Sequence, residues 1–315
     1  MKLIIQIPCY NEEQSLPVTL KDLPTRIDGI DTIEVLVIDD GSTDRTAEVA
    51  RELGVHHVVR FTSNQGLARA FAAGLDASLK LGADIIVNTD ADNQYCGEDI
   101  AKLVEPILLG KANIVVGTRD IKNIPHFSFM KKLLQRLGSS FVRSISNTTL
   151  PDTTSGFRAY DREAAMRLNV FSDFTYTLET IIQAGEHGLA ITHVPIRTNK
   201  VLRESRLFSS TGEYIGRSLT TILRIYTMYR PLRVFTAAAS ILLLSGLILV
   251  GRFFYYYLTL PHVQTGHIQS LVVASILIVI GFQVFLFGLI ADLTAKNRKL
   301  IEDILLRMKK NERND

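Results

Sequence analysis

The sequence contains no tryptophan and only two cysteines among its 315 residues. Cys9 and Cys96 are too few for the disulfide framework of a small secreted domain, and they suit a reducing compartment. The net charge of +3 gives no strongly basic surface, so we expect no nucleic-acid partner. The first eight residues are too short an apolar run for a signal peptide and favour a first β-strand.

Long apolar runs are absent before Pro231 and occur twice after it. Residues 234–250 and 271–291 carry no charge, and each run approaches the ~20 residues needed to cross a bilayer. Three tyrosines at 255–257 follow the first run and are typical of an interfacial aromatic belt. Buried helices of a soluble protein are the alternative, but the remaining chain is too short to wrap two of them. The pattern therefore predicts transmembrane helices at 231–260 and 268–293.

The chain before residue 120 alternates short β-branched runs with helical segments. Strands separated by helices of about 10–15 residues are typical of parallel βαβ units with right-handed crossovers. We therefore expect an α/β domain with a mainly parallel sheet that binds a nucleotide. Strands are predicted at 2–7, 33–38, 55–61, 83–89 and 112–117, and helices at 12–23, 43–53, 66–81 and 98–109.

Two aspartates, Asp90 and Asp92, follow the predicted strand at 83–89, whose centre is β-branched and apolar. At positions i and i+2 of an extended backbone they point the same way, about 6–7 Å apart at Cα. Both can face one hard cation at the carboxyl edge of the sheet, where open α/β sheets bind ligands. The pair predicts a Mg²⁺ or Mn²⁺ site open to substrate phosphates. On spacing alone, a polar turn that carries two aspartates remains an alternative.

Polar residues also follow the other predicted strands, and the ends of parallel strands meet at one edge. An aspartate there can hold a ribose hydroxyl or a base N–H, a tyrosine can pack against a base, and an arginine can pair with a phosphate. Each loop alone is a weak signal, and their gathering on one edge is a strong one. The loops are Pro8-Cys9-Tyr10-Asn11-Glu12-Glu13, Asp39-Asp40-Gly41-Ser42-Thr43-Asp44, Ser63-Asn64-Gln65-Gly66 and Gly117-Thr118-Arg119.

Together with Asp90-Ala91-Asp92-Asn93-Gln94 and Thr154-Ser155-Gly156-Phe157-Arg158-Ala159-Tyr160, these motifs resemble the family 2 glycosyltransferases of the GT-A fold. The resemblance covers residues 1–206, the predicted catalytic domain. Within the family the chain looks most like the polyprenyl-phosphate glycosyltransferases of the dolichol-phosphate mannose synthase type.

The resemblance implies roles for individual residues. Asp90, Asp92 and Gln94 correspond to the residues around the metal, and Arg119 corresponds to an arginine that faces the phosphates. Arg203 and Arg206 lie where relatives carry a basic phosphate-binding loop, although Glu204 replaces a common glycine there. Solvent-facing charges on a loop are the alternative. The nucleotide-sugar set is Pro8, Tyr10, Glu12, Asp39, Asp40, Asp90, Ala91, Asp92, Gln94 and Arg119, and the catalytic set is Asp92, Arg119, Arg203 and Arg206.

Two further segments, 125–147 and 207–230, interleave apolar and basic residues. This pattern predicts amphipathic helices in the headgroup layer of a membrane. Ordinary surface helices packed on the sheet are the alternative.

Lysines and arginines flank the two predicted spans on one side only, and the connection at 261–267 has none. The positive-inside rule then predicts a hairpin with the catalytic domain and both termini in the cytoplasm. The basic tail at 294–315 is predicted to be a cytosolic helix. Arg252 lies within the first span, where it is expected to snorkel outward or to pair in a homo-oligomer such as a tetramer.

The sequence thus predicts an inverting transfer of a sugar from a UDP- or GDP-sugar to undecaprenyl or dolichyl phosphate. A phosphate acceptor is already anionic at neutral pH, so no general base is assigned. A processive polysaccharide synthase is one alternative, but its Gln-x-x-Arg-Trp segment is excluded because the chain has no tryptophan. A catalytically inactive membrane scaffold with the same fold is the other.

Overall fold

The computed structural model describes residues 1–119, 150–170, 176–199, 220, 223–224, 226–259 and 268–311. The chain divides into two compact units, Met1–Ile222 and Leu223–Asp315. The predicted interfacial segment 125–147, Arg203 and Arg206, most of 207–230 and the connection at 261–267 lie outside the described residues.

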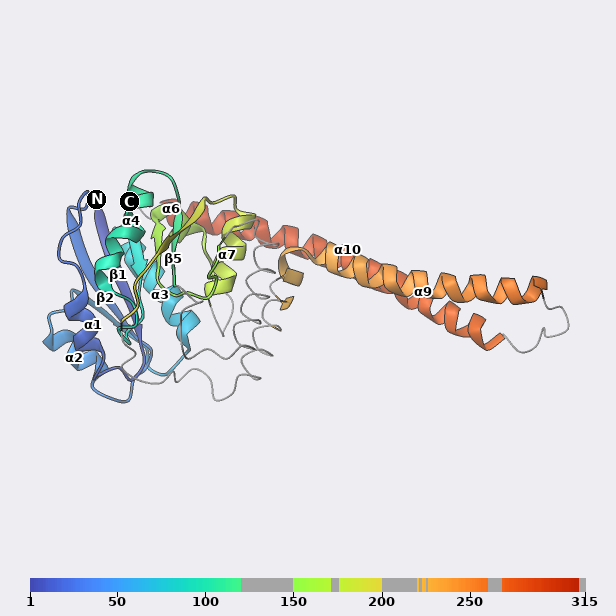
Figure 1. Ribbon diagram of the computed structural model, residues 1–315, viewed down its shortest axis with the longest axis horizontal. Coiled ribbons are helices and arrows are strands. Elements are labelled where there is room, and N and C mark those ends of the chain that lie inside the picture. The colour runs from blue at the N-terminus through green and yellow to red at the C-terminus, as the bar shows by residue number, and fades with distance from the viewer. Residues whose placement is uncertain are drawn as a thin grey trace. The chain divides into compact units, whose positions relative to one another are not determined.

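One sheet organises the first unit (Figure 1). Within the described residues it has seven strands in the order β3-β2-β1-β4-β6-β5-β7. Strand β6 is antiparallel to β4 and β5, and the other neighbouring pairs are parallel. The prediction of a mainly parallel sheet is therefore confirmed. The strands are β1 (Lys2–Cys9), β2 (Thr32–Asp39), β3 (His57–Arg60), β4 (Ile85–Asn88), β5 (Ile114–Thr118), β6 (Arg158–Asp161) and β7 (Ile191–Pro195).

Helices bury both faces of the central strands. Leu3, Ile5 and Ile7 of β1 pack in one core with the apolar residues of α4. On the opposite face, Phe71 of α3 stacks on Tyr176 with ring centroids 3.8 Å apart. Burial on both faces explains why β1 and β4 are nearly continuous apolar runs. The helices of this unit are α1 (Leu16–Asp22), α2 (Thr46–Glu52), α3 (Leu67–Lys80), the 3₁₀ turn η1 (Gly97–Asp99), α4 (Ile100–Leu108), α6 (Arg162–Arg167) and α7 (Thr177–Glu186).

Helix α1 begins at Leu16, four residues later than the sequence predicts. The backbone of Asn11 has a left-handed φ of 56°, which a continuing helix does not allow. The Glu12 N–H donates to Thr46 Oγ1 at 2.8 Å, outside its own segment. Residues 10–15 therefore form a loop because tertiary hydrogen bonds override the local helical pattern.

The second unit contains the two long apolar helices, α9 (Pro231–Thr259) and α10 (Ile268–Asn311). Their most apolar windows have mean hydropathies of 2.3 and 2.6, so both are long and apolar enough to cross a membrane. The pair is antiparallel, with Gly246 against Ile278 and Gly288 against Phe235. Small residues at such contacts let apolar helices approach closely. Helix α10 continues without a break through most of the predicted basic tail.

Candidate active site

The candidate site lies at the edge of the sheet where the parallel strands end. Strand register places Cys9 beside Asp39, and Gln6 beside Asn88. The loops after β1, β2 and β4 therefore emerge side by side. Because β6 runs in the opposite direction, the turn that precedes it reaches the same edge, and so does Arg119 after β5.

The loop after β1 is joined to the loop after β2 by hydrogen bonds. The Asn11 N–H donates to Ser42 Oγ at 2.9 Å, and the Asn11 side chain accepts from the Thr43 N–H at 2.9 Å. Glu12 is 9% exposed and Tyr10 is 42% exposed. Pro8 is buried within β1. These hydrogen bonds join the two loops, and the exposed Tyr10 ring is available for packing against a base.

Asp39 and Asp40 stabilise the loop after β2 and the loop before α3. Asp40 accepts from the N–H groups of Gln65 at 2.7 Å and Gly66 at 2.9 Å, so it fixes the loop before α3. Asp39 accepts from the Ser42 N–H at 2.9 Å and forms an ion pair of 3.1 Å with Arg60. Burial raises the pKa of Asp40, and the two backbone N–H groups oppose that rise. A hollow in this region is lined by Gly41, Ser42, Arg60, Phe61 and Thr62.

Asp90 is buried close to another carboxylate, whereas the carboxylate of Asp40 accepts two backbone hydrogen bonds. Burial and the neighbouring charge of Asp92 raise its pKa, Arg119 opposes the rise, and Glu12 adds to it. Gly156 packs directly against the carboxyl group, because a Cβ on that glycine would lie 3.2 Å from Asp90 Oδ1. Asp92 accepts from the N–H of Gln94 at 3.0 Å, which closes the turn between them.

These residues fit a hard divalent cation. Two carboxylates and an amide oxygen are the ligand types that Mg²⁺ and Mn²⁺ take, and a cation would relieve the crowded charge at Asp90. Among the described residues no cluster of three or more histidine, cysteine or acidic side chains forms a complete metal site. Asp90, Asp92 and Gln94 would supply three ligands, and the remaining coordination positions of such a cation would be left to substrate oxygens.

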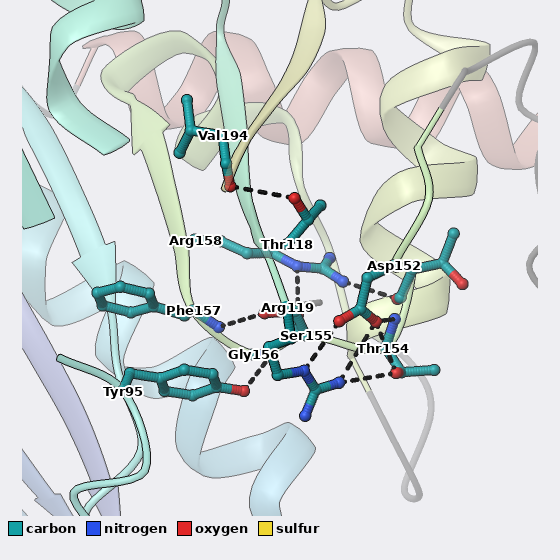
Figure 2. A network of polar contacts seen from close by, with 11 residues as sticks. Tyr95, Thr118, Arg119, Asp152, Thr154, Ser155, Gly156, Phe157, Arg158 and Val194 are labelled. Atoms are coloured by element: carbon teal, nitrogen blue, oxygen red, sulfur yellow. Dashed lines mark hydrogen bonds and ion pairs between the residues drawn. The ribbon is translucent and has the colours of Figure 1, made fainter. Parts of the chain in front are cut away.

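Arg119 is anchored by an acidic residue that the sequence reasoning missed. Its guanidinium donates to Asp152 at 2.9 and 3.3 Å and to Thr154 Oγ1 at 3.2 Å (Figure 2). Although burial opposes it, the Arg119 charge holds the pKa of Asp152 below its usual value. Arg119 is 13% exposed and Asp152 is fully buried. The arginine is thus fixed at the site edge, and the one available signal was an aspartate beside the Thr-Ser-Gly motif.

Two polar residues in otherwise apolar strands were also missed. Gln6 of β1 donates to Asn88 Oδ1 at 2.9 Å, and Asn88 of β4 donates to the Gly156 carbonyl and to Tyr176 Oη, both at 2.9 Å. This series of hydrogen bonds holds the turn at Gly156 against β4, the strand that leads to Asp90. The signal was the interruption of two apolar runs by amide side chains.

The loop after Asp92 is tied to the segment that follows β7. The Asn199 N–H donates to the Gln94 carbonyl at 2.9 Å, and its side chain donates to Asp22 at 3.2 Å. Asp22 also accepts from the Gly97 N–H at 2.8 Å. Asn199 is the last described residue before the segment that contains Arg203 and Arg206.

The chain is similar in sequence to named sugar transferases. The chain is 31% identical to a UDP-N-acetylglucosamine–dolichyl-phosphate N-acetylglucosaminyltransferase from Methanococcus voltae, over 67% of this chain and 90% of that protein. It is 29% identical to an undecaprenyl-phosphate mannosyltransferase from Micrococcus luteus, over 71% and 93%.

Among solved structures, a glucosyl-3-phosphoglycerate synthase from Mycobacterium tuberculosis in complex with Mn²⁺, UDP and phosphoglyceric acid shares the GT-A fold, with a TM-score of 0.55. That match has 20% identity and covers 72% of this chain and 77% of the other. The sequence profile of glycosyl transferase family 2 matches residues 4–168, more than half of the chain. The protein therefore belongs to glycosyl transferase family 2.

Proposed function

We propose that the protein transfers a hexose, with inversion, from a UDP- or GDP-sugar to a polyprenyl phosphate in the membrane. The observation that carries the proposal is the Asp90–Asp92 pair at the sheet edge, with Arg119 fixed beside it. Relatives named as dolichyl-phosphate and undecaprenyl-phosphate sugar transferases support the class of acceptor.

The donor would bind across the joined loops. Tyr10 offers an exposed ring for the base, and Glu12, Asp39 and Asp40 line the loops where the nucleoside would lie, with Pro8 and Ala91 beneath them. Asp90, Asp92 and Gln94 would hold Mg²⁺ or Mn²⁺. When bound, the cation supplies positive charge to the departing diphosphate. Arg119 adds a fixed positive charge to the same region, because Asp152 holds its guanidinium in place.

The acceptor phosphate would enter beside Asn199. Arg203 is four residues beyond Asn199 in the sequence, and the Asn199 N–H donates to the carbonyl of Gln94. Arg203 and Arg206 would pair with phosphate oxygens through charge-assisted hydrogen bonds. An anionic phosphate oxygen attacks without a general base, and direct attack at the anomeric carbon inverts its configuration.

The membrane arrangement follows from the two long apolar helices, α9 and α10. We propose that both cross the bilayer as a hairpin, with the catalytic unit and both termini in the cytoplasm. A cysteine introduced at position 264 should react with an impermeant label from outside intact cells, and one at position 311 should not. Equal labelling at both positions would contradict the hairpin.

The decisive experiment uses purified enzyme, labelled UDP- and GDP-sugars, and a short polyprenyl phosphate beside the matching polyprenol. Transfer should require the phosphate and a divalent cation. Arg203→Gln combined with Arg206→Gln should weaken acceptor use strongly, and donor affinity must be measured separately. Transfer to the free alcohol as readily as to the phosphate would refute the mechanism, because a base would then be needed. Absence of transfer to any acceptor would favour an inactive scaffold.

A further inference from the structure

Arg158, at the start of β6, is a completely buried arginine with no role in the proposal above. Its guanidinium donates to four neutral oxygens. The bonds go to the carbonyls of Ser155 at 2.7 Å, Thr153 at 2.9 Å and Thr177 at 2.8 Å, and to Thr180 Oγ1 at 2.9 Å.

These four oxygens belong to two separate segments. Thr153 and Ser155 lie in the turn that precedes β6, and Thr177 and Thr180 lie in α7. One planar group with five N–H donors can hold two carbonyls of a turn at fixed positions, which a lysine ammonium does not reproduce. Arg158 therefore fixes the turn 153–156 against α7. Figure 2 shows Arg158 beside Ser155 of this turn.

That turn contacts both charged groups of the candidate site. On one side of it, Asp152 and Thr154 bind the guanidinium of Arg119. On the other, Gly156 lies against the Asp90 carboxylate, and its N–H donates to Tyr95 Oη at 3.3 Å. A shift of the turn would move the partners of Arg119 and of Asp90 together.

Stability alone explains the buried arginine poorly. Removing a guanidinium from water is costly, and well-packed apolar residues at buried charged positions are often as stable or more stable. A fixed geometry for the turn is something an apolar side chain would not supply, because it has no donors for the Thr153 and Ser155 carbonyls.

We propose that Arg158 is a positioning residue that, through the turn 153–156, sets the cation-binding geometry of Asp90 and the orientation of Arg119. The inference rests on the proposed function, in which Asp90 and Asp92 hold a divalent cation. Residues that orient metal ligands typically change metal affinity about 10–100-fold when they are replaced.

The test compares Arg158→Lys with Arg162→Lys. Arg162 lies four residues along, just after β6 and at the start of α6, and donates to the Ala83 carbonyl at 2.7 Å. The full-length protein is titrated with Mn²⁺ in the presence of UDP or GDP, and free Mn²⁺ is followed by electron paramagnetic resonance. Thermal unfolding is recorded for each variant. We expect R158K to weaken Mn²⁺ binding about 10–100-fold and R162K to lower thermal stability without changing Mn²⁺ affinity.

Wild-type Mn²⁺ affinity in folded R158K, or an equal loss in R162K, would overturn the positioning role while leaving the proposed function intact. No Mn²⁺ binding by the wild type with either nucleotide would overturn both. If R158K does not fold, Thr180→Val decides, since it keeps the side-chain shape and removes one acceptor of Arg158. T180V should weaken Mn²⁺ binding in the same direction by a smaller factor, and an unchanged affinity would contradict the proposal.

Discussion

Two pairs of aspartates lie on one edge of the sheet, and their surroundings differ. Asp39 and Asp40, after β2, accept hydrogen bonds from the backbone of their own and the next loop and pair with Arg60. Asp90 and Asp92, after β4, repel one another, and burial together with that repulsion raises the pKa of Asp90. The first pair chiefly builds the loops, and the second pair is the proposed cation site. Similar aspartate motifs at strand ends therefore need not share a role.

The largest expected effect comes from removing a carboxylate of the second pair. Asp92→Ala should lower transfer by about 10³-fold or more, since charge stabilisation of several kcal/mol would be lost. The unfolding temperature should stay close to that of the wild type, because Asp92 chiefly closes a local turn with Gln94. Rates with Mg²⁺ and Mn²⁺ and thermal unfolding check both points. Normal turnover in this variant would remove the metal assignment.

A smaller effect is expected from crowding the same carboxylate. Gly156→Ala would place a methyl group 3.2 Å from Asp90 Oδ1 and 2.8 Å from Tyr176 Oη. Overpacking typically costs about 1–3 kcal/mol, and if Asp90 yields its cation-binding position to avoid it, the cation concentration for half-maximal rate should rise by about 5- to 160-fold. A metal titration of the rate measures this. An unchanged titration curve would show that the turn is free to move away from Asp90.

A substitution in the first pair, Asp39 and Asp40, should lower the free energy of unfolding rather than the metal affinity. Asp40→Asn keeps one acceptor oxygen and loses the other, which leaves the N–H of Gln65 or of Gly66 without its present partner. We expect a loss of about 1–3 kcal/mol in the free energy of unfolding. The apparent metal affinity should be that of the wild type. A lower metal affinity with unchanged stability in this variant would show that the two aspartate pairs do not differ in role.

The smallest effect concerns pH and the Arg119–Asp152 pair. Because Arg119 lowers the pKa of folded Asp152, the pair stabilises the protein above the unfolded pKa of about 3.9. That stabilisation is lost as pH falls through the lower, folded pKa. The unfolding temperatures of the wild type and Asp152→Asn should therefore differ at pH 7 and converge in acid. A difference that grows below pH ~4 would contradict the ion pair.

The sequence by itself determined the periodic features of this protein. Runs of β-branched residues located β1, β2, β4 and β5, since strands buried on both faces must be continuously apolar. The two uncharged runs located α9 and α10 for a similar reason, because length and hydropathy alone set what can cross a bilayer. The Asp90–Asp92 spacing likewise predicted metal ligands, a role that stays a prediction, and both residues follow β4 at the edge where the parallel strands end.

Only the tertiary structure decided the rest, because those features depend on contacts between residues far apart in the chain. The direction of β6 and the late start of α1 follow from strand pairing and from the Glu12–Thr46 bond, neither of which has a local signature. The sequence motifs likewise do not predict the hydrogen bonds that Asp152 and Arg158 make. Their partners, Arg119 and Thr180, are 33 and 22 residues away, and only folding brings a buried charge to the oxygens that stabilise it.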